Sequence, residues 1–196
     1  GLAVIGQSEG LAPADKKLYA LRDVTGTVDS IPLIASSVMS KKLASGAQAI
    51  LLDVKVGSGA FMKTIEEARA LAKAMVDIGR ENGRSVKAVL TDMDRPLGHA
   101  IGNALEIREV IDTLKGHGPE DLTHECIIMA AHMLVLSHIC DYETALTRVR
   151  EALDSGAALE RLRLMIDAQG GNSSVIDDES LLAIGQCTYD VIAPKA

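Results

Sequence analysis

Two well-separated cations, Arg22 and Lys41, flank several small hydroxyl side chains in the sequence LRDVTGTVDSIPLIASSVMSKK, which spans Leu21 to Lys42. An arginine offers a rigid fork of N–H donors, whereas a lysine offers a mobile point charge. Next to aliphatic carbons, such donors suit a flat ligand that has oxygens at its edge. The segment therefore indicates a binding site for a small, polar-edged molecule.

A helix is expected to hold the second cation. Ser30 is a good N-cap residue and Pro32 suits a first turn, so the helix should begin near Ile31. Four of its side chains then share one face, at positions i, i+3, i+4 and i+7: Ile34, Ser37, Val38 and Lys41. A face used only for packing would be apolar throughout. On spacing alone, a ligand-binding face and a half-exposed helix with its lysine in water both stay open, and the second is the simpler interpretation.

The elements along the chain alternate between strand and helix. A strand over Ala49–Val56, a capped helix over Thr64–Asn82 and a strand over Val86–Thr91 predict a βαβ unit with parallel strands. Four further helices are expected: Asn103–Leu114, Glu120–Ser137, Tyr142–Asp154 and Ala157–Ala168. The terminal regions should add strands at Leu2–Ile5 and Thr188–Ile192, short helices at Pro13–Leu21 and Glu179–Ile184, and a loop at Ser174–Asp178. The predicted fold class is α/β, with a mixed, largely parallel sheet flanked by helices.

Composition and charge limit the class of protein. The chain has 196 residues, of which 47% are apolar and 2% aromatic, so its core must be aliphatic. The net charge of −7 argues against nucleic acid and anionic membranes as partners, because no basic surplus exists to neutralise phosphates. No apolar run approaches the length of a membrane span. The three cysteines, Cys126, Cys140 and Cys187, follow no pairing pattern and indicate reduced thiols in a cytoplasmic protein.

The segment YALRDVTGTVDSIPLIASSVMSKK resembles the signature of the pyrimidine and thymidine nucleoside phosphorylases. The usual family form reads DVTATVDS, so Gly26 stands where the family has an alanine. Three further segments resemble the same family in the same order: DVKVGSGAFM, LTDMDRPLGHAIGNALEIREV and AQGG near Gly170. Together these matches cover nearly all of the chain. The resemblance implies a pentosyltransferase that converts a pyrimidine nucleoside and phosphate into the free base and (deoxy)ribose 1-phosphate.

The resemblance also implies roles for individual residues. Arg22 and Lys41 would be the catalytic cations, and with Ser37 they would bind the base through its carbonyl oxygens and ring N–H. The pocket around the base would be lined by Tyr19, Ile34, Val38 and Phe61. Cleavage of the glycosidic bond places negative charge on the departing base, and cations at its oxygens bind it more strongly as that charge develops. Phosphate would be the co-substrate, with no organic cofactor.

A monovalent cation such as potassium is a further implication of the resemblance. Its ligands would be the carbonyls of Leu97 and Ala100 and the carboxylate of Glu109, with the remaining ligands upstream of Gly1. The site would therefore be incomplete in this sequence. Without the resemblance, Glu109 reads as a surface residue of its helix.

Two other motifs give weaker signals. Gly57-Ser58-Gly59 after a strand resembles a phosphate-cradling loop, but a turn that uses glycines for positive φ is the favoured interpretation. Asp92 and Asp94 could suggest magnesium, although two acids at i and i+2 in a turn are more often solvated or capping groups.

The resemblance implies two lobes, both incomplete. Residues 13–47 would be part of a small helical lobe, and residues 1–12 and 48–196 would belong to an α/β lobe. The family's phosphate site uses an N-terminal Lys-x-Ser segment and a glycine- and Ser/Thr-rich stretch, and neither occurs in this sequence. We therefore expect the chain to hold the base-binding half of an active site, to be nearly inactive alone, and to form a homodimer in its full-length form.

Two alternatives stay open. An anthranilate phosphoribosyltransferase-like enzyme has a fold that the phosphorylases resemble, but it should have an acidic pair for magnesium pyrophosphate, and the cations around Ser37 argue against it. A non-catalytic, base-binding remnant would account for the missing phosphate segment.

Overall fold

The computed structural model describes residues 1–6, 8, 10–183, 185 and 187–193. At its centre, strand β1 (Ala49–Val56) and strand β2 (Ser85–Asp92) are joined by helix α3 (Ile65–Glu81). The strands pair in parallel, with Ala49 opposite Ser85 and Val56 opposite Asp92. The predicted βαβ unit and the α/β fold class are confirmed.

Local sequence explains why α3 begins and ends where it does. The backbone N–H of Glu67 donates to the Thr64 hydroxyl, and the Glu67 carboxylate accepts from the backbone N–H of Thr64. This reciprocal capping box satisfies donors that a helix start leaves without partners. At the other end Gly83 has φ +70°, which lets the chain turn directly into β2.

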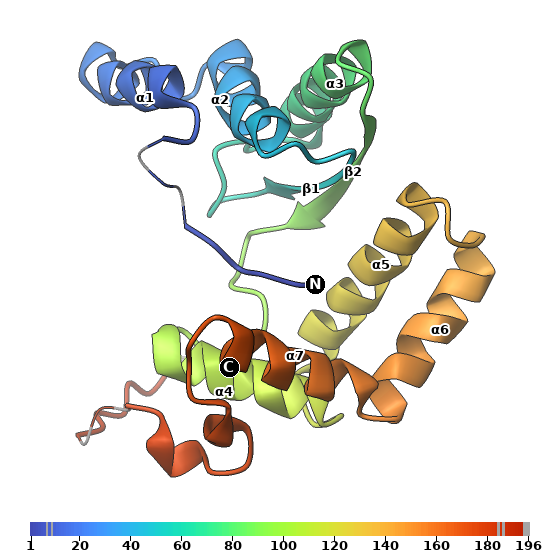
Figure 1. The fold of residues 1–196 in the computed structure, drawn as a ribbon. Helices are drawn as coiled ribbons and strands as arrows, with labels where there is room; N and C mark the ends of the chain where they lie inside the picture. The colour runs from blue at the N-terminus through green and yellow to red at the C-terminus, as the bar shows by residue number, and fades with distance from the viewer. Residues whose placement is uncertain (7, 9, 184, 186, 194–196) are drawn as a thin grey trace.

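The two faces of the strand pair have different coverings. Alternate β1 residues Ile50, Leu52 and Val54 are buried in the core together with α3 side chains, including Leu71 and Met75. On the other face, Lys55 reaches Glu125 of helix α5 (Glu120–Leu136) at 2.8 Å. In Figure 1, α2 and α3 lie above the strands and α5 approaches them from the lower right. Because successive residues of a strand point to opposite faces, β1 presents aliphatic side chains to the core and Lys55 to α5.

Helices α1 (Pro13–Thr25) and α2 (Ile31–Ala44) precede the sheet. The first runs one turn beyond the predicted Pro13–Leu21 and ends at Gly26, whose φ is +66°. The second begins at Ile31 as predicted, although the Ser30 side chain makes no capping hydrogen bond. Met39 of α2 is fully buried in the core that α3 and β1 share. This packing fixes α2, and α1 lies alongside it (Figure 1).

The second half of the chain is helical. The four predicted helices are confirmed as α4 (Asn103–Leu114), α5, α6 (Tyr142–Asp154) and α7 (Ala157–Ala168). Two short 3-10 helices follow, η1 (Ser173–Ile176) and η2 (Glu179–Leu181). Figure 1 places α4, α7 and these 3-10 helices in the lower part of the molecule, away from α1 and α2. Among the described residues, none of these helices is long and apolar enough to cross a membrane.

Three terminal predictions are wrong. Leu2–Ile5 is irregular and exposed rather than a buried strand, because the backbone of Val4 pairs with the side-chain amide of Gln169 and not with a strand. Residues 188–192 form no strand either, and the Tyr189 side chain is 90% exposed. An apolar run becomes a strand only where a neighbour accepts its hydrogen bonds. The segment predicted as a loop at Ser174–Asp178 is largely the 3-10 helix η1, whereas the short helix predicted at Glu179–Ile184 is limited to η2, with Ile184 outside the described residues.

Candidate functional site

A polar cluster lies between α1 and α2. The ammonium of Lys41 is 2.6 Å from a carboxylate oxygen of Asp15 and 3.0 Å from the hydroxyl of Ser37. Asp15, Arg22 and Ser37 are all buried, with exposed fractions of 8%, 6% and 7%. Two helices therefore hold two cations, one carboxylate and one hydroxyl in a small volume. We call these four residues the α1–α2 cluster.

Two contacts hold Arg22 at this cluster. Its guanidinium lies over the Tyr19 ring, 5.3 Å from the centroid, and one terminal nitrogen donates to the carbonyl of Val28. Its Nε is buried and has no hydrogen-bond partner among the described residues. A buried donor without a partner costs free energy, about 1–3 kcal/mol in typical cases. The Nε atoms of Arg84 and Arg108 are buried in the same way, so this feature does not by itself mark a ligand site.

Charge and burial oppose each other at Asp15. Burial raises the pKa of its carboxyl group, whereas hydrogen bonds from Lys41 and Ser37 and the positive charges of Lys41 and Arg22 lower it. The lowering effects are the larger, so the pKa of Asp15 lies below its ordinary value of 3.8. Asp15 is therefore an anion at neutral pH, and the α1–α2 cluster has one more positive than negative charge.

A pocket of about 720 Å³ lies next to this cluster along α2, over β1 and the loop after it. Three of the predicted base-contacting residues line it: Ile34, Val38 and Phe61. The other four, Tyr19, Arg22, Ser37 and Lys41, do not line it and lie at the α1 side of α2. The structure thus divides the predicted set into a polar group and an apolar group, on neighbouring faces of one helix.

Charged residues also border this pocket. Lys55 bridges Asp53 and Glu125, with both N–O distances at 2.8 Å. Burial lowers the pKa of Lys55, but the hydrogen bonds and charges of its two acidic partners raise it further, so the net shift is upward. Lys55 is therefore a permanent cation at the pocket wall. Sequence reasoning missed it, because a lysine on the strand face opposite the buried Ile50, Leu52 and Val54 reads as an ordinary solvent-facing residue.

Backbone N–H groups of the Gly57-Ser58-Gly59 loop donate to acceptors within the protein. The N–H of Ser58 donates to Asp94, and the N–H of Gly59 donates to the carbonyl of Met93. A Cβ on Gly57, whose φ is +130°, would lie 2.6 Å from the Asp94 carboxylate. The turn interpretation is confirmed for Gly57, whereas Gly59 has no positive φ and is needed because a Cβ there would lie 2.7 Å from the Met93 carbonyl.

The Asp92 and Asp94 carboxylates act as local caps. Asp92 accepts from the backbone N–H of Asp94 at 2.9 Å, in addition to the contact of Asp94 with Ser58. Among the described residues, no three His, Cys, Asp or Glu side chains gather closely enough to hold a metal ion. The capping interpretation is confirmed.

Glu109 lies against the loop that contains Leu97 and Ala100. One of its carboxylate oxygens accepts from the backbone N–H groups of His99 and Ala100, at 2.8 and 3.0 Å. A Cβ at Gly98 would come within 2.4 Å of the other oxygen. The three predicted cation ligands are therefore close together in the fold.

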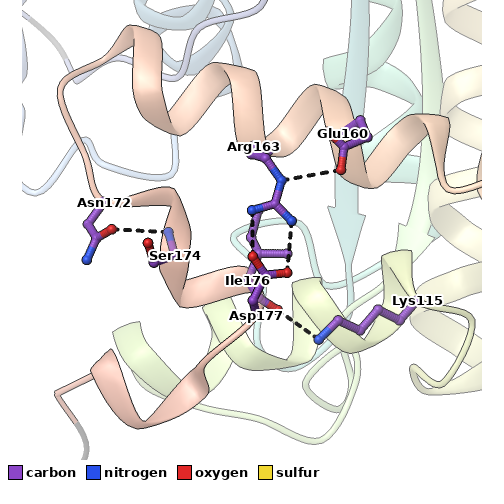
Figure 2. Close-up of polar contacts among 7 residues, drawn as sticks. All are labelled: Lys115, Glu160, Arg163, Asn172, Ser174, Ile176 and Asp177. Carbon is purple, nitrogen blue, oxygen red and sulfur yellow. Dashed lines mark hydrogen bonds and ion pairs between the residues drawn. The ribbon is translucent and has the colours of Figure 1, made fainter.

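A second polar cluster lies near η1 (Figure 2). The Arg163 guanidinium makes two parallel hydrogen bonds to Asp177, at 2.8 and 2.9 Å, and a third at 3.3 Å to Glu160. Lys115, the residue that follows α4, donates to the carbonyl of the fully buried Ile176. These contacts tie α4, α7 and η1 together, and we call them the C-terminal brace.

Comparison with known proteins identifies the class. Residues 1–159 match the glycosyl transferase family, a/b domain, and the chain belongs to this family. Two relatives from Staphylococcus aureus, strains bovine RF122 / ET3-1 and USA300, are called pyrimidine-nucleoside phosphorylase, and each is 57% identical over 196 residues. The match covers all of this chain and 45% of each relative, so the chain spans less than half the length of these relatives. The resemblance drawn from the sequence motifs is confirmed.

Asp15 is the cluster residue that sequence reasoning missed. It lies seven positions before Arg22, which places both on one face of a helix. An acid two turns before an arginine was the available signal, but it gains meaning only once α2 brings Lys41 to the same place.

Proposed function

We propose that this chain forms the base-binding half of a pyrimidine-nucleoside phosphorylase. The full enzyme would convert uridine, deoxyuridine or thymidine and phosphate into free base and (deoxy)ribose 1-phosphate. The observation that carries the proposal is the α1–α2 cluster, in which two cations and a hydroxyl meet beside an apolar pocket. The name of the relatives at 57% identity supports the same activity.

The chemistry of the reaction explains the need for these residues. A phosphate oxygen bonds to the anomeric carbon of the sugar while the bond from that carbon to the base nitrogen breaks. The electron pair leaves with the base, and its negative charge spreads to the carbonyl oxygens. Donors from Arg22 and Lys41 at those oxygens strengthen as the charge grows, which lowers the barrier rather than tightening substrate binding alone.

The apolar group would complete the recognition of the base. Ile34 and Val38 would contact one face of the ring, and Phe61, which is 57% exposed, is available to stack on it. Tyr19, already stacked with Arg22, would orient the guanidinium toward the base. A ligand that reached both groups would have to lie across the edge of α2, between Ser37 and Val38.

A chimera tests the proposal. Residues 1–196 of this chain replace the matching segment of the Staphylococcus aureus relative, which supplies the rest of the protein. Phosphorolysis of uridine and thymidine is followed by release of free base, with the intact relative as the positive control. We expect activity that requires phosphate, and a fall in kcat/KM of roughly 5- to 150-fold in Lys41→Met, which corresponds to about 1–3 kcal/mol. A folded chimera with no phosphorolysis, or full activity in Lys41→Met, would contradict the proposal.

Isothermal titration addresses base binding directly. We expect uracil or thymine to bind the chimera, and Arg22→Lys or Lys41→Met to weaken that binding by about 1–3 kcal/mol. Lys73→Met, which changes an exposed lysine of α3, is the matched control. Equal affinities in all four proteins would remove Arg22 and Lys41 from the site. The isolated chain is expected to be nearly inactive, because no phosphate-binding segment is among its residues.

We also propose that Leu97, Ala100 and Glu109 contribute to a potassium site. Carbonyl and carboxylate oxygens are the donors that such a hard cation prefers. The close approach of the loop to Glu109, which only a glycine at position 98 allows, supports the grouping. The cation would fix the loop before α4 and take no part in bond breaking. Thermal unfolding of the chimera should occur at a higher temperature in potassium chloride than in tetramethylammonium chloride, and Glu109→Gln should cancel the difference.

A homodimer is part of the same proposal. Leu18, Leu21 and Val24 on α1 are 55%, 55% and 80% exposed, as expected of a helical face that another copy covers. Sedimentation equilibrium of the chimera should give the mass of two chains. A charged substitution at Leu21 should lower that mass.

A further inference from the structure

Asp15 places a negative charge in a site that is proposed to stabilise another negative charge. Its carboxylate lies 2.6 Å from the Lys41 ammonium and is 8% exposed. Taken alone, this charge opposes the base that leaves. Its presence at the centre of the cluster therefore needs a separate reason.

The reason lies in the flexibility of lysine. A lysine side chain has four rotatable bonds, and an ammonium at its end is a mobile point charge. Lys41 is 28% exposed, so water could otherwise solvate its ammonium in several positions. The contact with Asp15 holds it where it also lies 3.0 Å from the Ser37 hydroxyl. The Ser37 hydroxyl gives its one proton to Asp15 and accepts from Lys41, so the ammonium, which has a third N–H, is held in one place before a ligand arrives.

The contact also spans two helices. Asp15 and Arg22 belong to α1, whereas Ser37 and Lys41 belong to α2. An ion pair between the helices fixes the distance between the two cations, which are attached to different elements. The cluster keeps a surplus of one positive charge, because Arg22 is not neutralised by a second carboxylate among the described residues of the cluster.

We propose that Asp15 is a positioning residue, which holds Lys41 and Ser37 in the geometry that receives the departing base. This inference rests on the proposed function of the α1–α2 cluster. Asp15 itself touches neither the base nor the sugar. The opposite role, in which Asp15 occupies the place of the base and competes with it, predicts that removing the carboxylate improves binding and turnover.

A double-mutant cycle in the chimera separates these roles. The variants are Asp15→Asn, Lys41→Met and the two combined, and kcat and KM are measured for thymidine and uridine. We expect Asp15→Asn to lower kcat about tenfold with a smaller change in KM, within the range of coupling between residues of one network. In the Lys41→Met background the same change should cost less than about twofold, because there is no ammonium left to position.

The control is Asp77→Asn, which breaks a lysine–aspartate contact of 2.5 Å on the exposed side of α3. It should leave kcat and KM unchanged. Asp15→Glu keeps the charge one methylene further along and should restore part of the kcat lost in Asp15→Asn. If Asp15→Asn does not fold, Asp15→Ser takes its place in the cycle: a kcat loss that disappears in the Lys41→Met background supports positioning, and an equal loss in both backgrounds overturns it.

Each result has one meaning. Equal losses from Asp15→Asn with and without Lys41 would show a general structural role, and a gain in kcat/KM would show competition, so either overturns the inference. If Lys41→Met changes neither kcat nor KM, the result contradicts the proposed function of the α1–α2 cluster, and the inference about Asp15 falls with it. Loss in Lys41→Met with no loss in Asp15→Asn leaves the proposed function standing and overturns the inference alone.

Discussion

The α1–α2 cluster and the C-terminal brace each contain an arginine, but the hydrogen bonds and the charge balance around that arginine differ. Arg163 in the brace donates from all three kinds of guanidinium nitrogen to two carboxylates, and one cation faces two acids. Arg22 in the cluster keeps a buried Nε without a partner, and two cations face one acid. A brace has its donors satisfied, whereas a binding site retains donors and charge for a ligand. Because Arg84 and Arg108 share the buried Nε, the surplus positive charge, and not the Nε alone, distinguishes the α1–α2 cluster from the brace.

Changing each arginine to lysine should give the largest contrast between the two regions. Arg22→Lys in the chimera should lower kcat/KM for thymidine by roughly 5- to 150-fold, since an ammonium cannot reproduce the guanidinium fork. Arg163→Lys should leave kcat/KM within about twofold and lower the melting temperature only. Steady-state kinetics and thermal unfolding of both variants check this. Equal losses of kcat/KM in Arg22→Lys and Arg163→Lys would contradict the distinction between a binding site and a structural support.

Acid should weaken the ion pairs of both Asp15 and Asp177, but the loss of stability should be larger for Asp15. The pKa of Asp15 lies below 3.8 in the folded chain, so its contribution to the free energy of unfolding is full above pH 3.8. That contribution is lost as the pH falls through the lower folded pKa. Asp15→Asn should cost about 1–3 kcal/mol at neutral pH, because it leaves Lys41 without its charged partner. The cost should shrink in acid, as measured by thermal unfolding at several pH values. A cost that is independent of pH would contradict the ion pair.

Asp177 provides the comparison. Its pKa is lowered chiefly by the hydrogen bonds from Arg163, with the same sign of pH dependence. Because this carboxylate is exposed, Asp177→Asn should change the melting temperature less than Asp15→Asn at every pH.

The brace can be loosened without touching the site. Lys115→Met removes the hydrogen bond to the carbonyl of buried Ile176, at a cost of about 1 kcal/mol. That cost corresponds to a fall of about 2–4 °C in melting temperature for a domain of this size. Hydrogen exchange should speed up in η1 and remain unchanged in α2. Faster exchange in α2 would mean that the two regions are coupled.

An exposed ion pair gives the smallest expected effect. Lys73→Met removes the contact with Asp77 one turn along α3, where the lysine side chain is 78% and the aspartate side chain 43% exposed. The cost should be about 0.3–0.5 kcal/mol, and base binding should not change. Thermal unfolding and titration of this variant set the baseline against which the other losses are read.

Sequence patterns predicted the centre of the molecule well, because the signals there are local. The capping box at Thr64 and the helix start at Ile31 depend on neighbours within one turn, and both lie where predicted. The predictions of terminal strands failed since their apolar runs, such as Leu2–Ile5, pair with no strand in the described part of the chain. Pairing is a property of the whole fold and is invisible to a short window.

Sequence patterns likewise predicted one part of the candidate site and missed another. Arg22, Ser37 and Lys41 come together through the packing of two adjacent helices, as the motif implied. The role of Asp15 depends on a contact across 26 positions of sequence. Helical spacing could not supply that contact, because it sets faces within one helix and not the distance between two.

The most direct test of the central claim uses leaving groups of different quality. If Arg22 and Lys41 stabilise charge on the departing base, their removal should matter less when the base holds that charge well by itself. We therefore compare kcat/KM of the chimera and of its Lys41→Met variant on thymidine and on 5-fluoro-2′-deoxyuridine, whose fluorine withdraws electrons from the ring. The predicted result is a loss that is several-fold larger for thymidine than for the fluorinated nucleoside. An equal loss for both would mean that Lys41 binds the nucleoside uniformly, and no loss for either would remove the α1–α2 cluster from the reaction.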